Sequence, residues 1–163
     1  MNTNPTIRQL AYDYHRRKCQ LEEVTQETLQ ELENYIEEQW QILSAKLENK
    51  IYFKDEEINC EQFIREYKEN GTLIVSKLHN NSKIFHPLDN LKGRAIHDYV
   101  HLTRGYNCEF EGELLTFKYQ SIGMSNQAKQ VMFSEIVLQA AYCTEFGVFA
   151  PKQKIILLPI EII

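Results

Sequence analysis

The segment from residue 25 to residue 47 carries the pattern that most constrains the fold. Its apolar residues are three or four positions apart, so on a helix they form one continuous stripe. Thr25 precedes the stripe and is a favoured N-cap residue. A helix with one apolar face must bury that face against other elements, so the pattern predicts a domain of packed helices. The stripe consists of Leu29, Leu32, Ile36, Trp40, Leu43 and Leu47.

Four further segments are predicted to be helical from their apolar periodicity and their end signals. The sequence TIRQLAYDYHRRK indicates a first helix near the N-terminus. Pro87 and Asp89-Asn90 offer caps for a helix that begins near Leu91, and another helix is expected after Gly112. The last helix runs from about Ser125 to Phe146 and is ended by Gly147. Helices therefore dominate the predicted structure.

The region between residues 51 and 90 has a different character. Its pieces IYF and TLIVSKL favour strands, and they flank a short helical segment, CEQFIREYK. The run TLIVSKLHNNSKIF, with a turn signal at Asn80-Asn81-Ser82, predicts a β-hairpin. The tail KIILLPIEII is predicted to be a terminal strand or an extended apolar segment. We therefore expect a mainly α helical bundle, one domain over residues 1–163, with a small β-hairpin or short β element.

Composition excludes several classes of protein. The net charge is −5 and the basic residues are scattered among acidic ones, which disfavours binding to nucleic-acid phosphates. No apolar run approaches the roughly 18 residues of a membrane-spanning helix. The four cysteines form no CxxC pair, and the first residues lack the apolar region of a signal peptide. These features predict reduced thiols and a cytoplasmic location.

The sequence AIHDYVH places two histidines four positions apart on a predicted helix. Residues at i and i+4 lie one above the other, so His97 and His101 can direct two imidazoles to one metal ion. Asp98 stands where the HExxH proteases have their glutamate, and it is a candidate ligand, general base or partner that orients a histidine. An HxxxH pair alone is a weak signal, because it is more often formed by ordinary surface or core histidines.

A third ligand can come from the next predicted helix. Gly112-Glu113 supplies a carboxylate near its start, after a loop that contains Gly105. A helix-loop-helix arrangement can bring Glu113 back to the face that carries His97 and His101. The spacing therefore predicts a metal site with two histidines and one glutamate.

The helix from 125 to 146 is apolar nearly all round, yet it carries three polar residues on one face. Glu135, Gln139 and Tyr142 stand at i, i+4 and i+7. A buried carboxylate without a partner costs several kcal/mol, so Glu135 needs a metal ion or a cation beside it. Arg94 or Arg104 is the alternative partner. Tyr142 is predicted to be a core tyrosine rather than an acid catalyst.

The motif residues resemble a known zinc signature. His97-Asp98-x-x-His101, followed by eleven residues and Glu113, is similar to the HDxxH-x11-E signature of the scaffold protein family that supports ubiquinone biosynthesis. The likeness is local, and this chain lacks the Leu- and Pro-rich stretch of that family between the second histidine and the glutamate. The resemblance implies a metal bound by His97, Asp98, His101 and Glu113, and it does not carry over a quinone substrate.

A longer pattern, over about half of the chain, resembles an uncharacterised family of bacteria and large phages. Val100 departs from it, because that family has glycine before the second histidine. The resemblance implies that Glu135 and Gln139 belong to the same site as the HDxxH helix, and it implies no activity. The matching residues are His86-Pro87, Asn90, Arg94-Ala95, His97-Asp98, His101, Gly105, Phe110, Gly112-Glu113, Glu135, Gln139, Gln153-Lys154 and Leu158-Pro159.

The first functional hypothesis is a metal-dependent hydrolase. Zinc lowers the pKa of a bound water to about 7, and Asp98 or Glu135 would move the proton. Iron(II) is the alternative metal, because histidines with carboxylates also suit non-haem iron. The substrate is a small molecule or peptide of unknown identity. We assign its binding to Gln139, Arg94 and Tyr142.

The second hypothesis is a non-catalytic binding or scaffold protein. In that case a structural metal, or a network of His, Asp and Glu side chains, only holds the helices together. An open coordination position in a concave pocket would favour the enzyme, whereas a closed site or a dry network would favour the scaffold.

Overall fold

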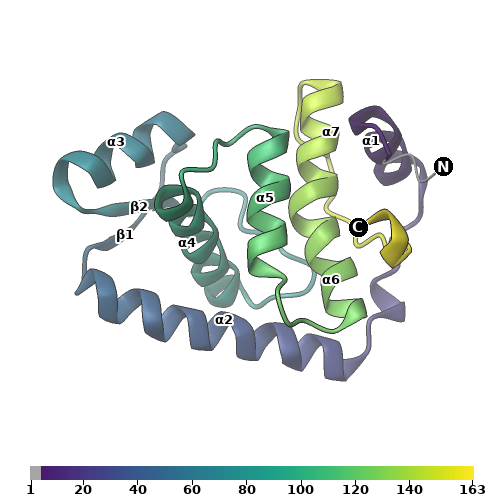
Figure 1. Ribbon diagram of the computed structural model, residues 1–163, viewed down its shortest axis with the longest axis horizontal. Helices are drawn as coiled ribbons and strands as arrows, with labels where there is room; N and C mark the ends of the chain where they lie inside the picture. Colours follow the sequence, from purple (N-terminus) through teal and green to yellow (C-terminus); the bar gives the residue numbers. More distant parts are fainter. Residues whose placement is uncertain (1–4) are drawn as a thin grey trace. The chain divides into compact units, whose positions relative to one another are not determined.

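The computed structural model describes residues 5–163, and its Cα positions divide into two compact units. One unit comprises residues 32–106, and the other combines the N-terminal residues up to Glu31 with residues 107–163. Helix α2 (Gln26–Leu47) begins in the second of these and continues into the first. Helices dominate the ribbon in Figure 1, and the described residues contain two short strands, so the predicted mainly α class is confirmed. A single domain over the whole chain stays a prediction.

The unit of residues 32–106 is built around a β-α-β element. Strand β1 (Ile51–Lys54) is followed by α3 (Cys60–Asn70) and by β2 (Leu73–Ser76). The strands are parallel, with Ile51 opposite Leu73 and Lys54 opposite Ser76. The predicted hairpin over residues 72–85 is therefore wrong. Its first half pairs with the earlier strand across the helix, and its second half is a loop.

Gly71 allows a short connection between α3 and β2. It ends α3 in the left-handed conformation, with φ +66°, which a residue with a Cβ adopts at a cost. Two residues later, the Leu73 backbone N–H donates to the carbonyl of Lys50 at 2.9 Å. Gly71 thus ends the helix and leads the chain directly into β2.

The core of this unit lies between α2, the sheet and α4 (Pro87–Arg104). The apolar stripe of α2 is confirmed here, because its later members are buried while Trp40 is partly buried. Such burial contributes roughly 1.5 to 3 kcal/mol for each large aliphatic side chain. The buried members of the cluster are Ile36, Leu43, Leu47, Leu73, Val75, Ala95 and Ile96.

Helix α4 begins earlier than predicted. His86 is its N-cap, with a ring nitrogen that accepts from the Leu88 backbone N–H at 3.4 Å, and Pro87 is the first helical residue. Proline fits this position because its missing N–H would be unpaired there anyway. Gly105 ends the helix with φ +67°, one residue after Arg104. The helix therefore carries Arg94, His97, Asp98 and His101 on its middle and last turns.

The other unit pairs the N-terminal helix with the end of the chain. Helix α1 (Ile7–Arg16) starts at Thr6 with a capping box and packs against α7 (Gln139–Phe146). Aromatic rings fill the contact, with Tyr14 and Tyr142 5.9 Å apart between ring centres. Helix α5 (Phe110–Gln120) completes this unit in Figure 1.

The predicted helix from 125 to 146 is present but not uniform. It consists of α6 (Asn126–Phe133), a π-helical turn η2 (Ser134–Leu138) and α7. Ser125 caps it, and the Glu31 carboxylate accepts from the Ser125 backbone N–H at 2.7 Å. Gly147 ends it with φ +71°, as predicted. The π turn was not predicted, and it carries Glu135.

The C-terminal tail is extended, so the strand alternative is wrong for the described residues. We call residues 153–158 the C-terminal strap. The Gln20 backbone N–H donates to the carbonyl of Ile155 at 2.7 Å, and its side-chain oxygen accepts from the Leu157 backbone N–H at 2.9 Å. Ile155, Ile156 and Leu158 are fully buried. The tail is thus part of the core of its unit.

The structure bears on two expectations, one about the cysteines and one about membrane-spanning helices. Cys19 and Cys143 are free, whereas Cys60 and Cys108 are disulfide-bonded, so the expectation of four reduced thiols is wrong. The cysteines then give no support to a cytoplasmic location, which stays a prediction. Among the described residues, none of the helices has the length and apolar character needed to cross a bilayer.

Candidate metal centre

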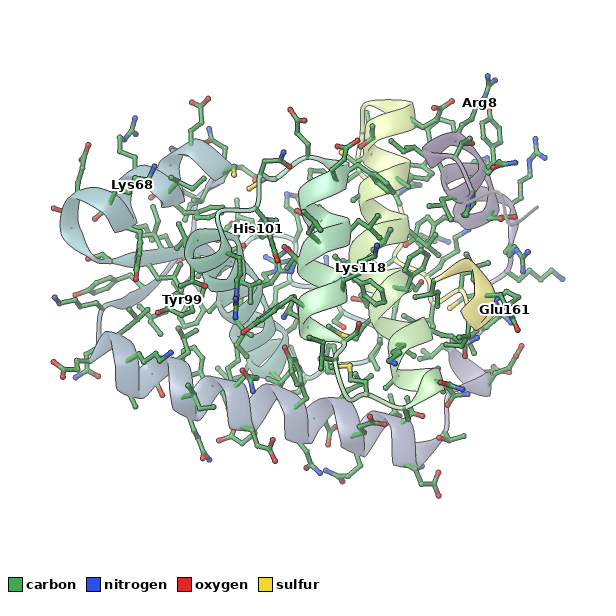
Figure 2. The ribbon with its side chains drawn as sticks, in the orientation of Figure 1. Arg8, Lys68, Tyr99, His101, Lys118 and Glu161 are labelled. Atoms are coloured by element: carbon green, nitrogen blue, oxygen red, sulfur yellow. The ribbon has the colours of Figure 1, made fainter. Side chains whose placement is uncertain are left out.

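Two histidines meet on the last turns of α4. The Nε2 atoms of His97 and His101 are 3.0 Å apart, and their ring centres are separated by 4.7 Å. His101 is only 2% exposed, and its position on α4 can be followed in Figure 2. The i, i+4 spacing therefore brings both imidazoles to one point, as the sequence predicted.

Backbone geometry fixes the tautomer of His101. Its Nδ1 lies 3.2 Å from the carbonyl oxygen of Tyr106, which can only accept, so this nitrogen carries the hydrogen. In the neutral ring the Nε2 of His101 is then the acceptor in its 3.0 Å contact with the Nε2 of His97. A histidine that ligates a metal through Nε2 is held in the same way by an acceptor on its other nitrogen.

Asp98 follows His97 on α4 and acts electrostatically on Arg94. The carboxylate partly offsets the effect of burial, which lowers the pKa of the Arg94 guanidinium. Arg94 donates to the carbonyls of Ser76 at 3.0 Å, Leu78 at 2.6 Å and His79 at 2.6 Å. These bonds hold the loop after β2, a structural role that sequence reasoning missed. Substrate binding by Arg94 stays a prediction.

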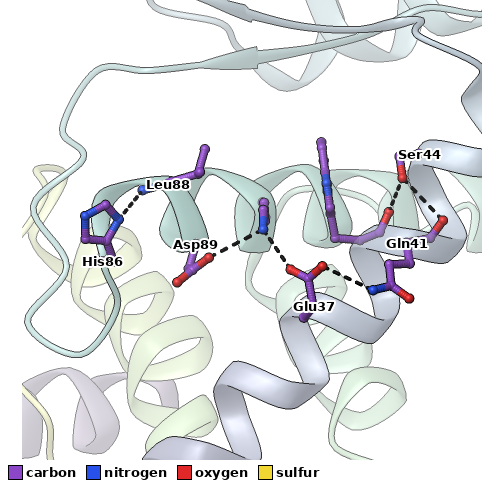
Figure 3. A network of polar contacts seen from close by, with 8 residues as sticks. Glu37, Gln41, Ser44, His86, Leu88 and Asp89 are labelled. Atoms are coloured by element: carbon purple, nitrogen blue, oxygen red, sulfur yellow. Dashed lines mark hydrogen bonds and ion pairs between the residues drawn. The ribbon is translucent and has the colours of Figure 1, made fainter.

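Nearer the start of α4, ion pairs join this helix to α2. The Lys92 ammonium lies 2.8 Å from the Glu37 carboxylate and 3.6 Å from Asp89. Figure 3 shows Glu37 and Asp89 in this network, with dashed lines for the contacts. The hydrogen bond from Lys92 lowers the pKa of Glu37, which is fully exposed. This network joins α2 to α4 and contributes no proposed ligand atom.

Glu113 stands in the first turn of α5, in the other unit, and is partly buried. The residue before it has no room for a side chain: a Cβ on Gly112 would lie 1.7 Å from the carbonyl oxygen of Asn107. The Asn107 side chain accepts from the backbone N–H groups of Glu109 at 3.0 Å and Gly112 at 3.2 Å. Gly112 and Asn107 thus fix the backbone that presents Glu113.

The donor types suit a metal ion. His97 and His101 are suitable donors, since imidazoles together with carboxylates are common ligands of zinc and iron(II). A contribution from Glu113, which belongs to the other unit, stays a prediction. The identity of the metal does not follow from these donors. The predicted inclusion of Asp98 in the ligand set stays a prediction.

Glu135 is the acidic residue of the π turn. Its Oε1 atom is out of contact with solvent and has no hydrogen-bond partner, and burial raises the pKa of the carboxyl to about 7. Gln139 Nε2 and Gln153 Oε1 are likewise buried without partners. The carboxyl atom Oε1 is therefore buried as predicted, although Glu135 as a whole residue is only partly buried. Its direction toward the HDxxH helix stays a prediction.

Two tyrosines stand near this acid. Tyr142 is 8% exposed and packs on Tyr14 and Phe146, which supports the prediction of a core tyrosine. Tyr14 was not singled out from the sequence. It is fully buried, and desolvation raises the pKa of its hydroxyl to about 12, with smaller contributions that include the charge of Glu135. Its oxygen accepts from the Lys154 backbone N–H at 2.9 Å.

Comparison with known proteins adds no relative. The chain matches no protein-family profile, no curated protein and no solved structure. The two resemblances described above rest on motif residues alone, and both stay predictions.

Proposed function

We propose that this chain is a metal-binding protein whose ligands are His97, His101 and Glu113, with zinc as the preferred ion and iron(II) as the alternative. The observation that carries the proposal is the paired histidines of α4, with Nε2 atoms 3.0 Å apart and one ring almost fully buried. Two imidazole nitrogens at this separation need only a small adjustment to face one ion. Asp98, the neighbouring carboxylate, is the proposed fourth ligand.

The surroundings of the histidines support the same assignment. The Tyr106 carbonyl favours the tautomer of His101 in which Nε2, the nitrogen proposed to ligate the ion, carries the lone pair. Gly112 and the Asn107 cap give Glu113 a backbone with little freedom. Ligands held in this way lose little conformational entropy on binding, which favours a genuine site over a chance group of polar residues.

For the reaction, we propose metal-dependent hydrolysis of a small molecule or peptide. A bound zinc ion would supply a water with a pKa near 7. Asp98 or Glu135 then accepts the proton of that water. Glu135 is suited to this role because its own pKa is about 7, so it is half ionised near neutral pH. Gln139 and Tyr142 are the proposed contacts to substrate, with Arg94 as a third.

One observation favours the second candidate, a non-catalytic scaffold. Both ring nitrogens of His101 already have partners, and the ring is almost fully buried, which is typical of a closed structural site. A metal at such a site would stabilise the fold without an open coordination position.

A titration of metal-free protein with Zn²⁺, followed by calorimetry, tests the proposal. We expect about one ion per chain and at least tenfold weaker binding in His97→Ala, His101→Ala and Glu113→Gln. His79→Ala is the matched control, because the exposed His79 side chain pairs with the exposed Glu57 at 2.7 Å and lies outside the proposed ligand set. If the control and the three variants bind Zn²⁺ equally well, the proposed ligand set is wrong.

A second measurement separates the enzyme from the scaffold. The absorption spectrum of bound Co²⁺ reports the coordination number and changes when a small anion enters an open position. A spectrum that responds to added azide supports the enzyme, whereas a tetrahedral spectrum that does not respond supports the scaffold.

A further inference from the structure

Three buried polar atoms in the unit that contains α7 have no hydrogen-bond partner. They are Glu135 Oε1, Gln139 Nε2 and Gln153 Oε1, and we call these three residues the polar cluster. A buried donor or acceptor left unpaired costs roughly 1 to 3 kcal/mol, so folded proteins rarely keep three of them together. Polar groups retained at such a cost are typical of a binding site.

The π turn places two members of the cluster on one face. Glu135 lies inside η2, and Gln139 follows four residues later at the start of α7. Residues four apart lie nearly above one another on a helix. Short π segments of this kind are frequent at functional sites.

The C-terminal strap brings the third member to the same level. Ser134 Oγ donates to the carbonyl of Lys154 at 3.1 Å, while the Gln130 side chain donates to the carbonyl of Leu158. The strap therefore runs opposite to the helix, so Gln153, just before Lys154, lies toward Glu135. Tyr14 binds the backbone of Lys154 and interacts electrostatically with Glu135, which connects the same two segments independently.

The unpaired atoms define the chemistry of a ligand. Glu135 Oε1 and Gln153 Oε1 are acceptors and Gln139 Nε2 is a donor. A primary carboxamide has the complementary groups: two N–H donors and one carbonyl acceptor. A carboxylate offers no donor, and a guanidinium offers no acceptor. We propose that the polar cluster binds the primary carboxamide group of a small molecule or of a peptide side chain.

This inference names a substrate class for the proposed enzyme, and it rests on the proposed function only for the idea that the bound amide is a substrate. Binding itself uses Glu135, Gln139 and Gln153, and it requires no metal. Buried water molecules that satisfy the same three atoms are the competing explanation. The two explanations differ in whether an amide can displace the water and whether the three side chains control its affinity.

The test is a titration of the metal-free full-length chain with acetamide, followed by ¹H–¹⁵N NMR. We expect saturable shifts of the backbone amides of residues 134–139 and 153–154. N,N-dimethylacetamide keeps the carbonyl but lacks both N–H donors, and acetate lacks donors altogether, so neither should produce these shifts. Absence of saturable shifts with acetamide, or equal shifts with all three compounds, overturns the inference.

Variants assign the binding to the cluster. Gln139→Met and Gln153→Met keep the length of the side chain and remove the amide, so acetamide should bind at least tenfold more weakly to each. Their melting temperatures should be unchanged or higher, because each change removes an unpaired buried atom. Gln153 lies outside the helices, so its variant carries the test if Gln139→Met fails to fold. Unchanged acetamide affinity in a folded variant contradicts the inference.

Gln130→Met is the matched control. The Gln130 side chain already donates to the carbonyl of Leu158, so this variant should lose stability and keep its affinity for acetamide. The metal and amide proposals also fail separately. A chain that binds acetamide but no Zn²⁺ contradicts only the metal site, and a chain that binds Zn²⁺ but no acetamide contradicts only the amide site.

Discussion

Helix α4 and the helix from 126 to 146 both carry buried polar atoms, but the two sets differ in whether these atoms have hydrogen-bond partners. On α4, His101 bonds to His97 and to the Tyr106 carbonyl, and Arg94 donates to three backbone carbonyls. On the other helix, Glu135 and Gln139 each keep a buried atom without a partner. The polar residues of α4 are therefore compatible with a stable fold in the absence of a ligand, whereas those of the π turn reduce stability until something binds.

The largest effect should come from Gly112 on α5, which is compared with Gly93 on α4. A Cβ on Gly112 would meet the Asn107 carbonyl at 1.7 Å, so Gly112→Ala should unwind the first turn of α5 and lower the unfolding free energy by about 4 kcal/mol. Gly93 on α4 is the control. Its added Cβ would lie 3.7 Å from Ile36 Cδ1, so Gly93→Ala should stabilise the protein by about 0.5 to 1 kcal/mol.

Urea unfolding of both variants measures these changes. Equal effects of the two substitutions would contradict the close contact at Asn107 and, with it, the fixed position of Glu113.

The next effect is a pH dependence that should come from Glu135. Burial raises the pKa of this carboxyl from 4.5 to about 7, so between these values the folded state binds more protons than the unfolded state. The contribution of Glu135 to the unfolding free energy is therefore full below pH 4.5 and lost as the pH rises to about 7. The loss should be on the order of 3 kcal/mol. Urea unfolding at several pH values measures it.

Glu135→Gln supplies the comparison for that experiment, because the amide keeps the shape and does not titrate. Its unfolding free energy should change less with pH over the same range. A slope identical to that of the unchanged protein would show that Glu135 is not the titrating group.

A smaller effect is expected when the metal site is emptied. If the site is catalytic, the cores of the two units should hold without an ion. His97→Ala or treatment with a chelator should then lower the melting temperature by less than about 5 °C and preserve the helical circular dichroism. Complete unfolding of the chelated protein, under conditions in which the metal-loaded form is stable, would favour the scaffold.

The smallest effect should come from the surface contact between Glu37 and Lys92. The Lys92 ammonium lies 2.8 Å from the Glu37 carboxylate, but this carboxylate is exposed to solvent. Water and salt therefore screen the attraction between the two charges. Glu37→Gln should leave the melting temperature unchanged within error, like Glu38→Gln, which alters an exposed residue of the same helix. A clear loss for Glu37→Gln alone would show that this contact positions α4.

The helices could be predicted because their signals are local. The stripe of α2, the cap at Ser125 and the stop at Gly147 each act within a few residues. The parallel pairing of β1 with β2 could not be predicted in this way. The segment after Gly71 is compatible with a hairpin or with a partner across α3, and only the tertiary contacts of Leu73 and Val75 decide between them.

The candidate site was predictable to a similar extent. The spacing of His97 and His101 dictates their approach on one helix face, and the apolar surroundings of Glu135 indicated its burial. The π turn, the bond from His101 to Tyr106 and the contact of Gly112 with Asn107 depend on backbone conformation. No residue type specifies these features on its own, so the sequence did not reveal them.

The central claim is that the chain binds a metal through His97, His101 and Glu113. Elemental analysis of protein purified without a metal-affinity tag tests it most directly. We predict about one zinc or iron ion per chain, and a loss of most of that metal in His101→Ala and Glu113→Gln but not in His79→Ala. Protein that contains no metal after purification, and takes up none when Zn²⁺ or Fe²⁺ is added, would contradict the claim.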